Sequence, residues 1–443
     1  MDTIVALSTP WGRSGVGVIR LSGPEALTIA QAVCGVHPDW VDRRASLRRA
    51  ADEDSQIIDE VLTQWMKGPR SFTGEDVVEI SAHGNPVILA AIIDRLIRAG
   101  ARPARPGEFT RQALLNGRAD LLQAEAINAL IHARSIAGVR DAVHGLGGEL
   151  SQAVATMTET LLDVAAELEA RLDHPDDDLS LKSDEAVAET LAALTQQAEG
   201  LAASWTSSKV RQAGATVAIV GPVNAGKSSL FNHLVGVERA LVSSRPGTTR
   251  DVVERAVLLE GLDITFMDTA GEGGTDDPLE AAGVALGRSL SEDADLILVV
   301  VPMNRAPDAT TAAILERTQS SARLCVGSFL DESIHADAPL VDHRISNLSG
   351  QGIDALRDAI RAQLGARSTG GEVATVLSQR QHDLFRAVAR CTSTAREALL
   401  GMLGPAVAAT ETVMAIERLG ELVGLDAKEA VLDRLFSRFC IGK

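Results

Sequence analysis

One octapeptide constrains the fold of this chain more than any other feature. Residues 221–228 read Gly-Pro-Val-Asn-Ala-Gly-Lys-Ser, which matches the pattern GxxxxGK[ST]. An apolar run at 215–220 predicts a strand before it, and residues 229–235 predict a helix after it. In that setting the glycines let backbone N–H groups surround phosphate oxygens, and the helix adds its positive N-terminal end. The sequence therefore predicts a site for nucleotide phosphates.

The rest of the chain predicts an α/β multidomain protein. Between residues 215 and 364, short apolar runs alternate with helical stretches, which is typical of a mostly parallel sheet; the further runs lie at 263–267, 296–301 and 324–327. We expect an N-terminal α+β domain at 1–118, with strands at 3–7, 16–21 and 77–81 and a helix at 86–99. An all-helical domain is expected at 119–210 plus 373–443, and the P-loop domain with its linker, 211–372, is inserted into it.

Composition excludes several classes of protein. The formal net charge of −18 argues against attraction to nucleic acid over the whole surface, although a local basic patch stays open. Tyrosine is absent and aromatic residues make up 3%, so a platform for stacking bases is not expected. Four scattered cysteines predict neither a disulfide framework nor a zinc site. The chain has no long apolar run and no secretory pattern at its start, which predicts a cytoplasmic protein without a membrane segment.

Two further segments fit the same nucleotide. Asp-Thr-Ala-Gly at 268–271 follows a predicted strand, so its carboxylate can hold Mg²⁺ through water and its glycine N–H can meet the γ-phosphate. Gly-Thr-Thr-Arg-Asp at 247–251 predicts a loop whose Thr249 completes the Mg²⁺ shell begun by Ser228. This combination predicts a GTPase. The candidate nucleotide-binding residues are Asn224, Ala225, Gly226, Lys227, Ser228, Ser229, Asp268, Thr269, Ala270, Gly271, Asp331, Ser346, Asn347 and Leu348.

The element that reads the base departs from the usual pattern. GTPases usually carry Asn-Lys-x-Asp after the next strand, whereas this chain has Ser-Phe-Leu-Asp at 328–331. Asp331 either accepts hydrogen bonds from guanine or is an ordinary loop acid, and Phe329 can cover the base by packing. Ser-Asn-Leu at 346–348 lies where a further base-contacting loop is expected. Guanine selectivity is therefore open at this point.

Several segments spread over the whole chain identify a family. They are residues 2–6 (Asp-Thr-Ile-Val-Ala), 15–20 (Gly-Val-Gly-Val-Ile-Arg), 72–76 (Phe-Thr-Gly-Glu-Asp), 106–111 (Pro-Gly-Glu-Phe-Thr-Arg), 121–126 (Leu-Leu-Gln-Ala-Glu-Ala), 224–229 (Asn-Ala-Gly-Lys-Ser-Ser) and 439–443 (Phe-Cys-Ile-Gly-Lys). With these segments, the chain resembles the MnmE (TrmE) family of tRNA-modification GTPases over its whole length.

The resemblance implies a function in tRNA modification. Members work with MnmG, an FAD- and NADH-dependent partner, on carbon 5 of the wobble uridine of certain tRNAs. They use a folate one-carbon donor, 5-formyltetrahydrofolate or a relative, bound where two N-terminal domains form a homodimer, and they form a heterotetramer with the partner. The matching folate contacts are Arg20, Glu79, Arg118 and Lys443. The same resemblance suggests a chemical role for Cys440. The simpler interpretation is that Cys440 is a buried thiol at the end of a helix.

The resemblance also implies how GTP is hydrolysed. In this family the nucleotide domains dimerise around K⁺, which can replace an arginine finger as a stabiliser of charge. The matching K⁺ positions are Asn224, Ser243, Arg245 and Thr248, where Arg245-Pro246 departs from the usual small or apolar residues. Glu280 matches the glutamate that orients the attacking water and is the candidate catalytic residue.

Two other functions share the nucleotide motifs. A ribosome-assembly GTPase switch usually ends in a basic RNA-binding domain, whereas this chain ends in an amphipathic helix and Cys-Ile-Gly-Lys. A nucleotide-binding scaffold without preference for guanine would fit Ser328 and Phe329, and a comparison of GTP with ATP distinguishes it from a GTPase.

Overall fold

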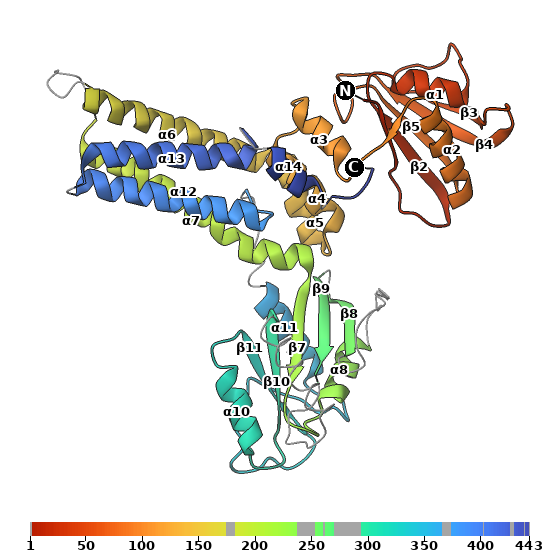
Figure 1. Cartoon of the computed structure of the whole chain (residues 1–443). Helices are drawn as coiled ribbons and strands as arrows, with labels where there is room; N and C mark the ends of the chain where they lie inside the picture. The colour runs from red at the N-terminus through yellow and green to blue at the C-terminus, as the bar shows by residue number, and fades with distance from the viewer. Residues whose placement is uncertain are drawn as a thin grey trace. The chain divides into compact units, whose positions relative to one another are not determined.

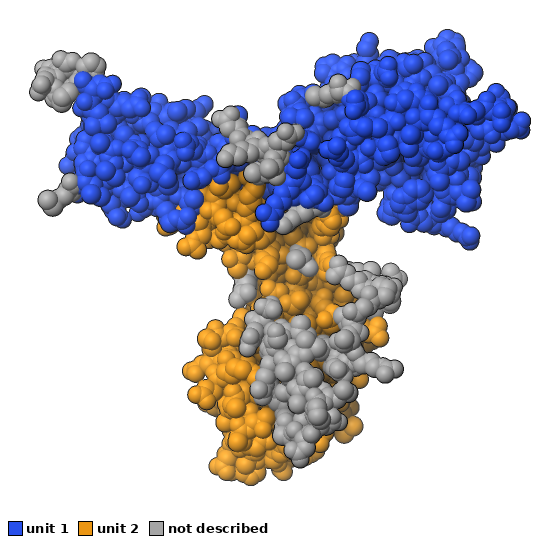
Figure 2. All heavy atoms as spheres, viewed as in Figure 1, with its two compact units in different colours: residues 1–128, 146–195, 387–443 blue, residues 129–145, 196–386 orange. Residues whose placement is uncertain are grey.

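The computed structural model describes residues 2–173, 182–236, 253–259, 262–269, 294–365, 374–401, 403–425, 429–437 and 439–442. The chain splits into two compact units, which Figure 2 colours separately. Unit 1 comprises residues 1–128, 146–195 and 387–443, and unit 2 comprises residues 129–145 and 196–386. Predictions for the loop at 247–251 and for Glu280 lie outside the described residues.

Unit 1 contains a six-stranded sheet in the order β3-β4-β5-β2-β1-β6. Its strands are β1 (Ile4–Leu7), β2 (Ser14–Ser22), β3 (Ala45–Ala51), β4 (Ile57–Met66), β5 (Val77–Gly84) and β6 (Arg102–Pro103). Neighbouring strands are antiparallel except β1 and β6. Helices α1 (Ala26–Cys34) and α2 (Pro86–Arg98) pack apolar side chains against the sheet (Figure 1). The α+β class predicted for the N-terminal part is confirmed.

Strands β3 and β4 were not predicted from the sequence, and in β3 a buried arginine interrupts the expected apolar pattern. Arg48 of β3 lies in the core, donates to the Thr63 hydroxyl at 2.9 Å and pairs with Asp39 at 2.9 Å. Its guanidinium also stacks 4.2 Å from the Trp40 ring centroid. An arginine therefore occupies a position where the alternation of a strand leads one to expect an apolar residue.

The helical part contains long helices of 20 to 30 residues and shorter helices of 8 to 12 residues. They are α3 (Glu108–Leu115), α4 (Leu121–His132), α5 (Ile136–Leu146), α6 (Glu149–Asp173), α7 (Asp184–Ala213), α12 (Gln379–Leu400), α13 (Gly404–Val423) and α14 (Glu429–Phe436). The stripe on α6 that includes Val154, Met157 and Leu161 is buried, as its three- and four-residue spacing predicts. Between α7 and α12, the hydroxyls of Thr195 and Thr392 lie 2.8 Å apart. Among the described helices, none combines the length and apolarity needed to cross a membrane.

Unit 2 contains the second six-stranded sheet, in the order β12-β11-β10-β7-β9-β8. Its strands are β7 (Ala215–Val220), β8 (Val253–Leu259), β9 (Leu262–Asp268), β10 (Leu296–Pro302), β11 (Arg323–Ser328) and β12 (His343–Arg344). All pairs are parallel except β8 with β9. One apolar cluster joins the sheet to α8 (Lys227–Val235) and α11 (Ile353–Gly365), and a second joins it to α10 (Ala309–Arg317). The predicted mostly parallel sheet is confirmed.

Where α7 runs into β7, unit 2 has a tightly bonded joint. Arg211 of α7 pairs with Asp141 of α5 at 2.5 Å, and the two side chains are 3% and 12% exposed. The Ser135 hydroxyl donates to the carbonyl of Arg211 at 2.6 Å and accepts from the N–H of Gly138 at 2.9 Å. A Cβ added at Gly138 would lie 2.5 Å from that same carbonyl, so only glycine fits there.

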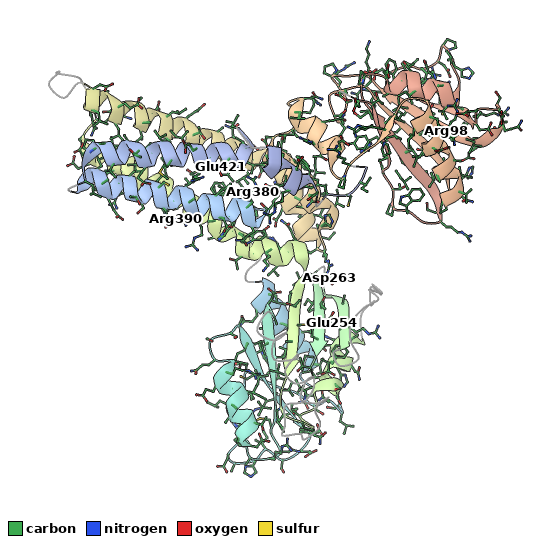
Figure 3. The ribbon with its side chains drawn as sticks, in the orientation of Figure 1. Arg98, Glu254, Asp263, Arg380, Arg390 and Glu421 are labelled. Carbon is green, nitrogen blue, oxygen red and sulfur yellow. The ribbon has the colours of Figure 1, made fainter. Side chains whose placement is uncertain are left out.

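Below this joint, Gly214 turns the chain into β7 with a φ of +76°. A Cβ at Gly214 would lie 2.7 Å from the carbonyl of Asp263, which stands at the start of β9 (Figure 3). Burial raises the pKa of Asp263, against the lowering effect of the Arg134 charge. The close approach of these backbones aligns β7 with β9, and the two strands carry the P-loop and Asp268 at their other ends.

Candidate nucleotide-binding site

The P-loop leaves the carboxyl end of β7, at the centre of the sheet, and enters α8. Asn224 and Gly226 both have left-handed backbones, with φ of +60° and +88°. A Cβ at Gly221 would lie 2.5 Å from the carbonyl of Val300, so the loop has no room for a side chain there. The loop therefore passes close to β10 and turns sharply into the N-terminus of α8, where backbone N–H groups are available to phosphate oxygens.

Lys227 is the charged group of this loop. The side chain is buried, and its ammonium donates to the carbonyl of Pro222 at 2.9 Å. This bond holds the lysine side chain back against the P-loop, which precedes Lys227 in the sequence. The same position beside the loop backbone suits an ammonium that contacts phosphate oxygens.

Asp268 and Thr269 end the neighbouring strand. The Thr269 hydroxyl donates to the carbonyl of Ile219 at 2.8 Å, which fastens the end of β9 to β7. Asp268 Oδ1 is buried without a hydrogen-bond partner among the described residues. Burial raises the pKa of Asp268, while a hydrogen bond with Ser228 and the charge of Lys227 lower it. An unpartnered carboxylate oxygen beside the Ser228 hydroxyl fits the donor set of an Mg²⁺ site, directly or through water.

The two loops expected to contact the base both lie at the same edge of the sheet. Ser346 is fully buried, whereas Leu348 is 86% exposed. Asp331 is exposed at the surface after β11. Phe329, beside it, has a left-handed backbone with a φ of +63°. The Asp331 side chain therefore does not pack in the core, and a ligand or solvent can reach it.

Contacts that sequence patterns did not reveal bind these loops to the P-loop. Ser328 Oγ donates to the carbonyl of Ala225 at 2.7 Å, and Asn347 Nδ2 donates to the carbonyl of Gly226 at 3.1 Å. Arg305 Nη2 donates to the carbonyl of Val223 at 3.3 Å. The Ser328 and Asn347 bonds span 103 and 121 residues of sequence. Nothing in a local pattern signals such pairs.

A second group of predicted residues lies in unit 1. Arg20 and Glu79 face each other across β2 and β5, and Glu79 Oε1 accepts from Arg20 Nη2 at 2.7 Å and Nε at 2.9 Å. The Arg20 guanidinium carbon lies 5.7 Å from the Phe72 ring centroid and 5.9 Å from that of Phe109. Arg118 Nε donates to the Ser71 carbonyl at 3.3 Å. Arg20, Glu79 and Arg118 therefore gather around the segment that carries Ser71 and Phe72.

The carboxyl-terminal segment reaches the same place. Arg20 Nη1 donates to the carbonyl of Gly442 at 3.3 Å, and the Ser8 hydroxyl donates to it at 3.1 Å. The next residue, Lys443, lies outside the described residues, as do Ser243, Arg245, Thr248, Thr249, Ala270, Gly271 and Glu280. Cys440 is exposed, so the expected burial of this thiol was wrong. It lies beyond the last turn of α14, and its carbonyl accepts from the N–H of Gly107.

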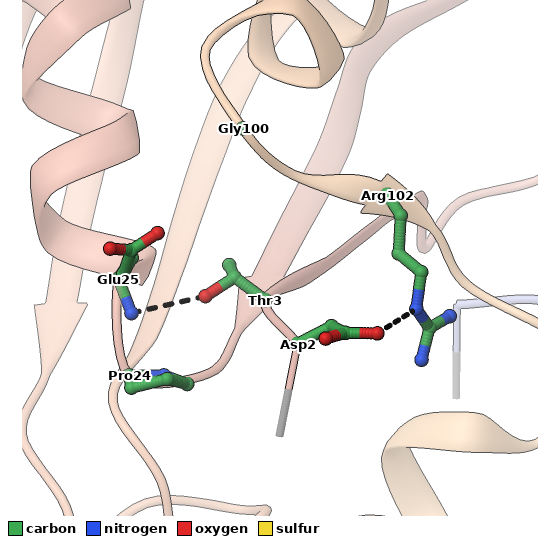
Figure 4. A pocket seen from close by; sticks show the side chains of 6 residues that line it. All are labelled: Asp2, Thr3, Pro24, Glu25, Gly100 and Arg102. Carbon is green, nitrogen blue, oxygen red and sulfur yellow. Dashed lines mark hydrogen bonds and ion pairs between the residues drawn. The ribbon is translucent and has the colours of Figure 1, made fainter.

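A separate surface pocket of unit 1 offers less to a ligand (Figure 4). It is lined by Asp2, Thr3, Pro24, Glu25, Gly100 and Arg102. Arg102 pairs with Asp2 at 3.0 Å and with Glu108 at 2.6 Å, and the Thr3 hydroxyl accepts from the N–H of Glu25 at 3.0 Å. These bonds already occupy the side chains of Asp2, Thr3 and Arg102, and none of the predicted site residues lines the pocket.

Comparisons with known proteins cover the chain almost completely. The family described as "GTP-binding protein TrmE N-terminus" matches residues 3–118, and the MnmE helical domain matches residues 121–440. The tRNA modification GTPase MnmE of Myxococcus xanthus strain DK1622 is 42% identical over 450 residues, which covers 100% of this chain and 99% of that protein. The protein of the same description from Synechococcus sp. strain CC9605 is 39% identical over 448 residues, with the same coverage.

This chain belongs to the MnmE family. Its enzyme class is that of a GTP hydrolase, in agreement with the P-loop geometry. Among solved structures, Era of Aquifex aeolicus bound to GDP·AlF4⁻ aligns with 40% of this chain and 66% of its own at 24% identity. The TM-score of that alignment is 0.28, too low to support an argument about the MnmE chain.

The raised pKa of Asp268 predicts a pH dependence for Mg²⁺. As pH falls, this carboxyl takes up a proton at a higher pH than an ordinary aspartate, so protons compete with the metal earlier. We expect binding of a fluorescent nucleotide to need a higher Mg²⁺ concentration for half-maximal signal at pH 5 than at pH 7.5. Asp268→Asn should remove most of that difference. Since the folded state holds the proton more tightly, the free energy of unfolding should fall as pH rises through the raised pKa. Equal pH dependence in the variant would contradict this role.

Proposed function

We propose that this chain is a K⁺-dependent GTPase that, with an MnmG-type partner, takes part in modifying carbon 5 of the wobble uridine of certain tRNAs with a folate one-carbon donor. The observation that carries the proposal is 42% identity over the full chain to a protein named tRNA modification GTPase MnmE. The tRNA substrate, the partner, a homodimer, a heterotetramer with the partner and a cytoplasmic location belong to the same proposal.

For hydrolysis, the described residues are suited to binding GTP and to placing positive charge beside its phosphates. Lys227 and the N–H groups at the start of α8 bind the phosphates, and Ser228 with Asp268 holds Mg²⁺. Bound Mg²⁺ and K⁺ would neutralise charge that develops on the transferred phosphoryl group. Asn224 supplies one K⁺ contact in this proposal, with Ser243, Arg245 and Thr248, and Thr249 joins the Mg²⁺ shell. Glu280 orients the water that attacks.

For guanine recognition, Asp331 is the proposed acceptor. It lies three residues after Ser328, the last residue of β11, whose hydroxyl holds the P-loop. A carboxylate accepts two N–H donors at once, and guanine offers such a pair on its base-pairing edge, whereas adenine does not. The exposed Asp331 carboxylate is free of any hydrogen bond in the described part of the chain that would compete.

For the folate donor, the group around Arg20 has suitable chemistry. A guanidinium beside the exposed Phe72 ring, with a carboxylate opposite, offers donors, an acceptor and an apolar face to a ring that carries polar edges and an anionic tail. Both Arg20 and Glu79 are partly exposed, at 20% and 27%, so a ligand can reach them. Lys443 follows Gly442, which is already bonded to Arg20.

Replacing Arg20 tests this part of the proposal. Because a hydrogen bond to a charged group contributes about 1.5–3 kcal/mol, Arg20→Ala should weaken binding of 5-formyltetrahydrofolate roughly 10- to 100-fold. Wobble-uridine modification, measured by mass spectrometry of tRNA with the partner present, should fall likewise, while GTP turnover of the chain alone stays within about twofold. Arg98→Ala is the matched control, since Arg98 lies on the exposed side of α2 (Figure 3). Unchanged folate affinity in a folded Arg20→Ala protein would refute the assignment.

A further inference from the structure

Two neighbouring carbonyls of the P-loop are each held by a side chain from a different loop. Ser328, the last residue of β11, donates to Ala225, and Asn347 donates to Gly226. Ser328 is fully buried and has one hydroxyl proton. Its oxygen lies 2.7 Å from the Ala225 carbonyl and 3.4 Å from that of Val301, so the proton is committed to the shorter bond. The Gly226 carbonyl accepts a helical bond from the N–H of Leu230 at 2.9 Å, and Asn347 adds a second bond, from a side chain, to the same oxygen.

The two side chains lie near the same point of the P-loop. A Cβ built on Gly226 would lie 2.7 Å from Asn347 Nδ2 and 3.8 Å from the Cβ of Ser328. Both residues are therefore close to Gly226, where the P-loop enters α8.

Asn347 is itself held by a hydrogen bond between its backbone carbonyl and a residue of α8. His233 Nε2, on α8, lies 2.6 Å from the Asn347 carbonyl, and since a carbonyl only accepts, the imidazole carries the proton. Arg357 Nη2, on α11, donates to the carbonyl of His233 at 2.6 Å. The loop at 346–348 is thus tied to α8 at both its backbone and its side chain. Its position cannot change without moving the P-loop.

We propose that Asn347 is a positioning residue of the nucleotide site, which shares with Ser328 the task of holding the P-loop in its binding conformation. The inference rests on the nucleotide site proposed above. Asn347 links the loop beside the base to the loop around the phosphates, so it acts on how long the nucleotide stays bound. It touches none of the reacting atoms, and the chemical step does not depend on it.

Removing the amide tests the tether. Asn347→Ala should speed the release of a fluorescent GDP analogue about 5- to 10-fold, the loss expected for one hydrogen bond. The KM for GTP should rise by a similar factor, while kcat stays within about twofold. Asn304→Ala is the matched control, because Asn304 lies in the same unit and bonds only to Glu332 at the surface in the described residues. Native circular dichroism in each variant checks that the fold persists.

A rescue distinguishes the tether from a general packing effect. Because the Cβ of Ser328 lies near Gly226, adding Ser328→Asn to the Asn347→Ala background places an amide beside the same P-loop carbonyls. This second change should return release and KM to within about twofold of the original chain. Unchanged release in Asn347→Ala, or no rescue by Ser328→Asn, would overturn the tether alone. If the unaltered chain failed to bind the GDP analogue, the nucleotide site and the tether would both be overturned.

Discussion

Lys227→Ala is expected to lower GTP hydrolysis by roughly 100-fold or more, because loss of one preorganised charge at a developing oxyanion has effects of that size. The ammonium is already held over the P-loop through its bond to the Pro222 carbonyl, so its position costs no reorganisation when the nucleotide binds. The variant removes this charge but leaves the glycines that shape the loop. Binding of GTP should weaken as well, since Lys227 meets both ground-state and transition-state phosphates.

The measurement is steady-state phosphate release over a range of GTP concentrations. Lys209→Ala provides the control, because Lys209 is an exposed lysine on α7 in the same unit. That control should keep the original rate. Retention of more than a tenth of the activity in a folded Lys227→Ala protein would show that the GTP phosphates do not bind beside Lys227.

Asp141→Ala is expected to destabilise the joint between α5 and α7 in unit 2 by roughly 3–5 kcal/mol, because it leaves the Arg211 guanidinium in the core without its carboxylate. The ends of α5 and α7 should then open more often, since the Ser135 and Gly138 contacts join the same two helices. Replacing both partners by apolar residues of similar size, in Asp141→Leu with Arg211→Met, should recover much of the loss, because no buried charge then remains.

Hydrogen exchange with mass spectrometry measures the effect locally. Peptides from α5 and the last turns of α7 should exchange faster in Asp141→Ala, while peptides from the sheet of unit 1 keep their original rates. Asp358→Ala is the control, because it breaks the exposed pair with Arg361 and should change stability by less than about 1 kcal/mol. Equal protection of α5 in Asp141→Ala and the original chain would contradict the role of the joint.

The contrast between predicted and unpredicted features follows from sequence distance. Strand β7 was predicted with its observed bounds, because a run of consecutive apolar residues meets a glycine-rich loop and both signals are local. Strand β8 was not predicted, since it is antiparallel at the edge of the sheet and carries Glu254 and Arg255 in sequence. The parallel order of β7, β10 and β11 brings the loops after these strands to the same edge of the sheet as the P-loop.

The contacts within the site needed the fold. Ser328 was known from sequence only as a departure from a usual asparagine, and its bond to Ala225 shows what the short side chain still does. Asn347 was a candidate because of its place in the chain, but its amide bond to Gly226 joins residues 121 positions apart. Likewise, a charged pair such as Arg211 with Asp141 gives no local signal, because each residue alone is typical of a helix surface.

GTP hydrolysis by the purified full chain, in K⁺ and in Na⁺ buffer with ATP as the competing substrate, tests the proposed function most directly. We expect turnover of GTP to be clearly faster in K⁺ and turnover of ATP to stay near background, because Asp331 selects guanine and K⁺ completes the charge around the phosphates. Equal rates in the two cations would contradict K⁺ activation and the roles given to Asn224 and the loop at 243–248. Equal use of ATP would contradict guanine selection by Asp331.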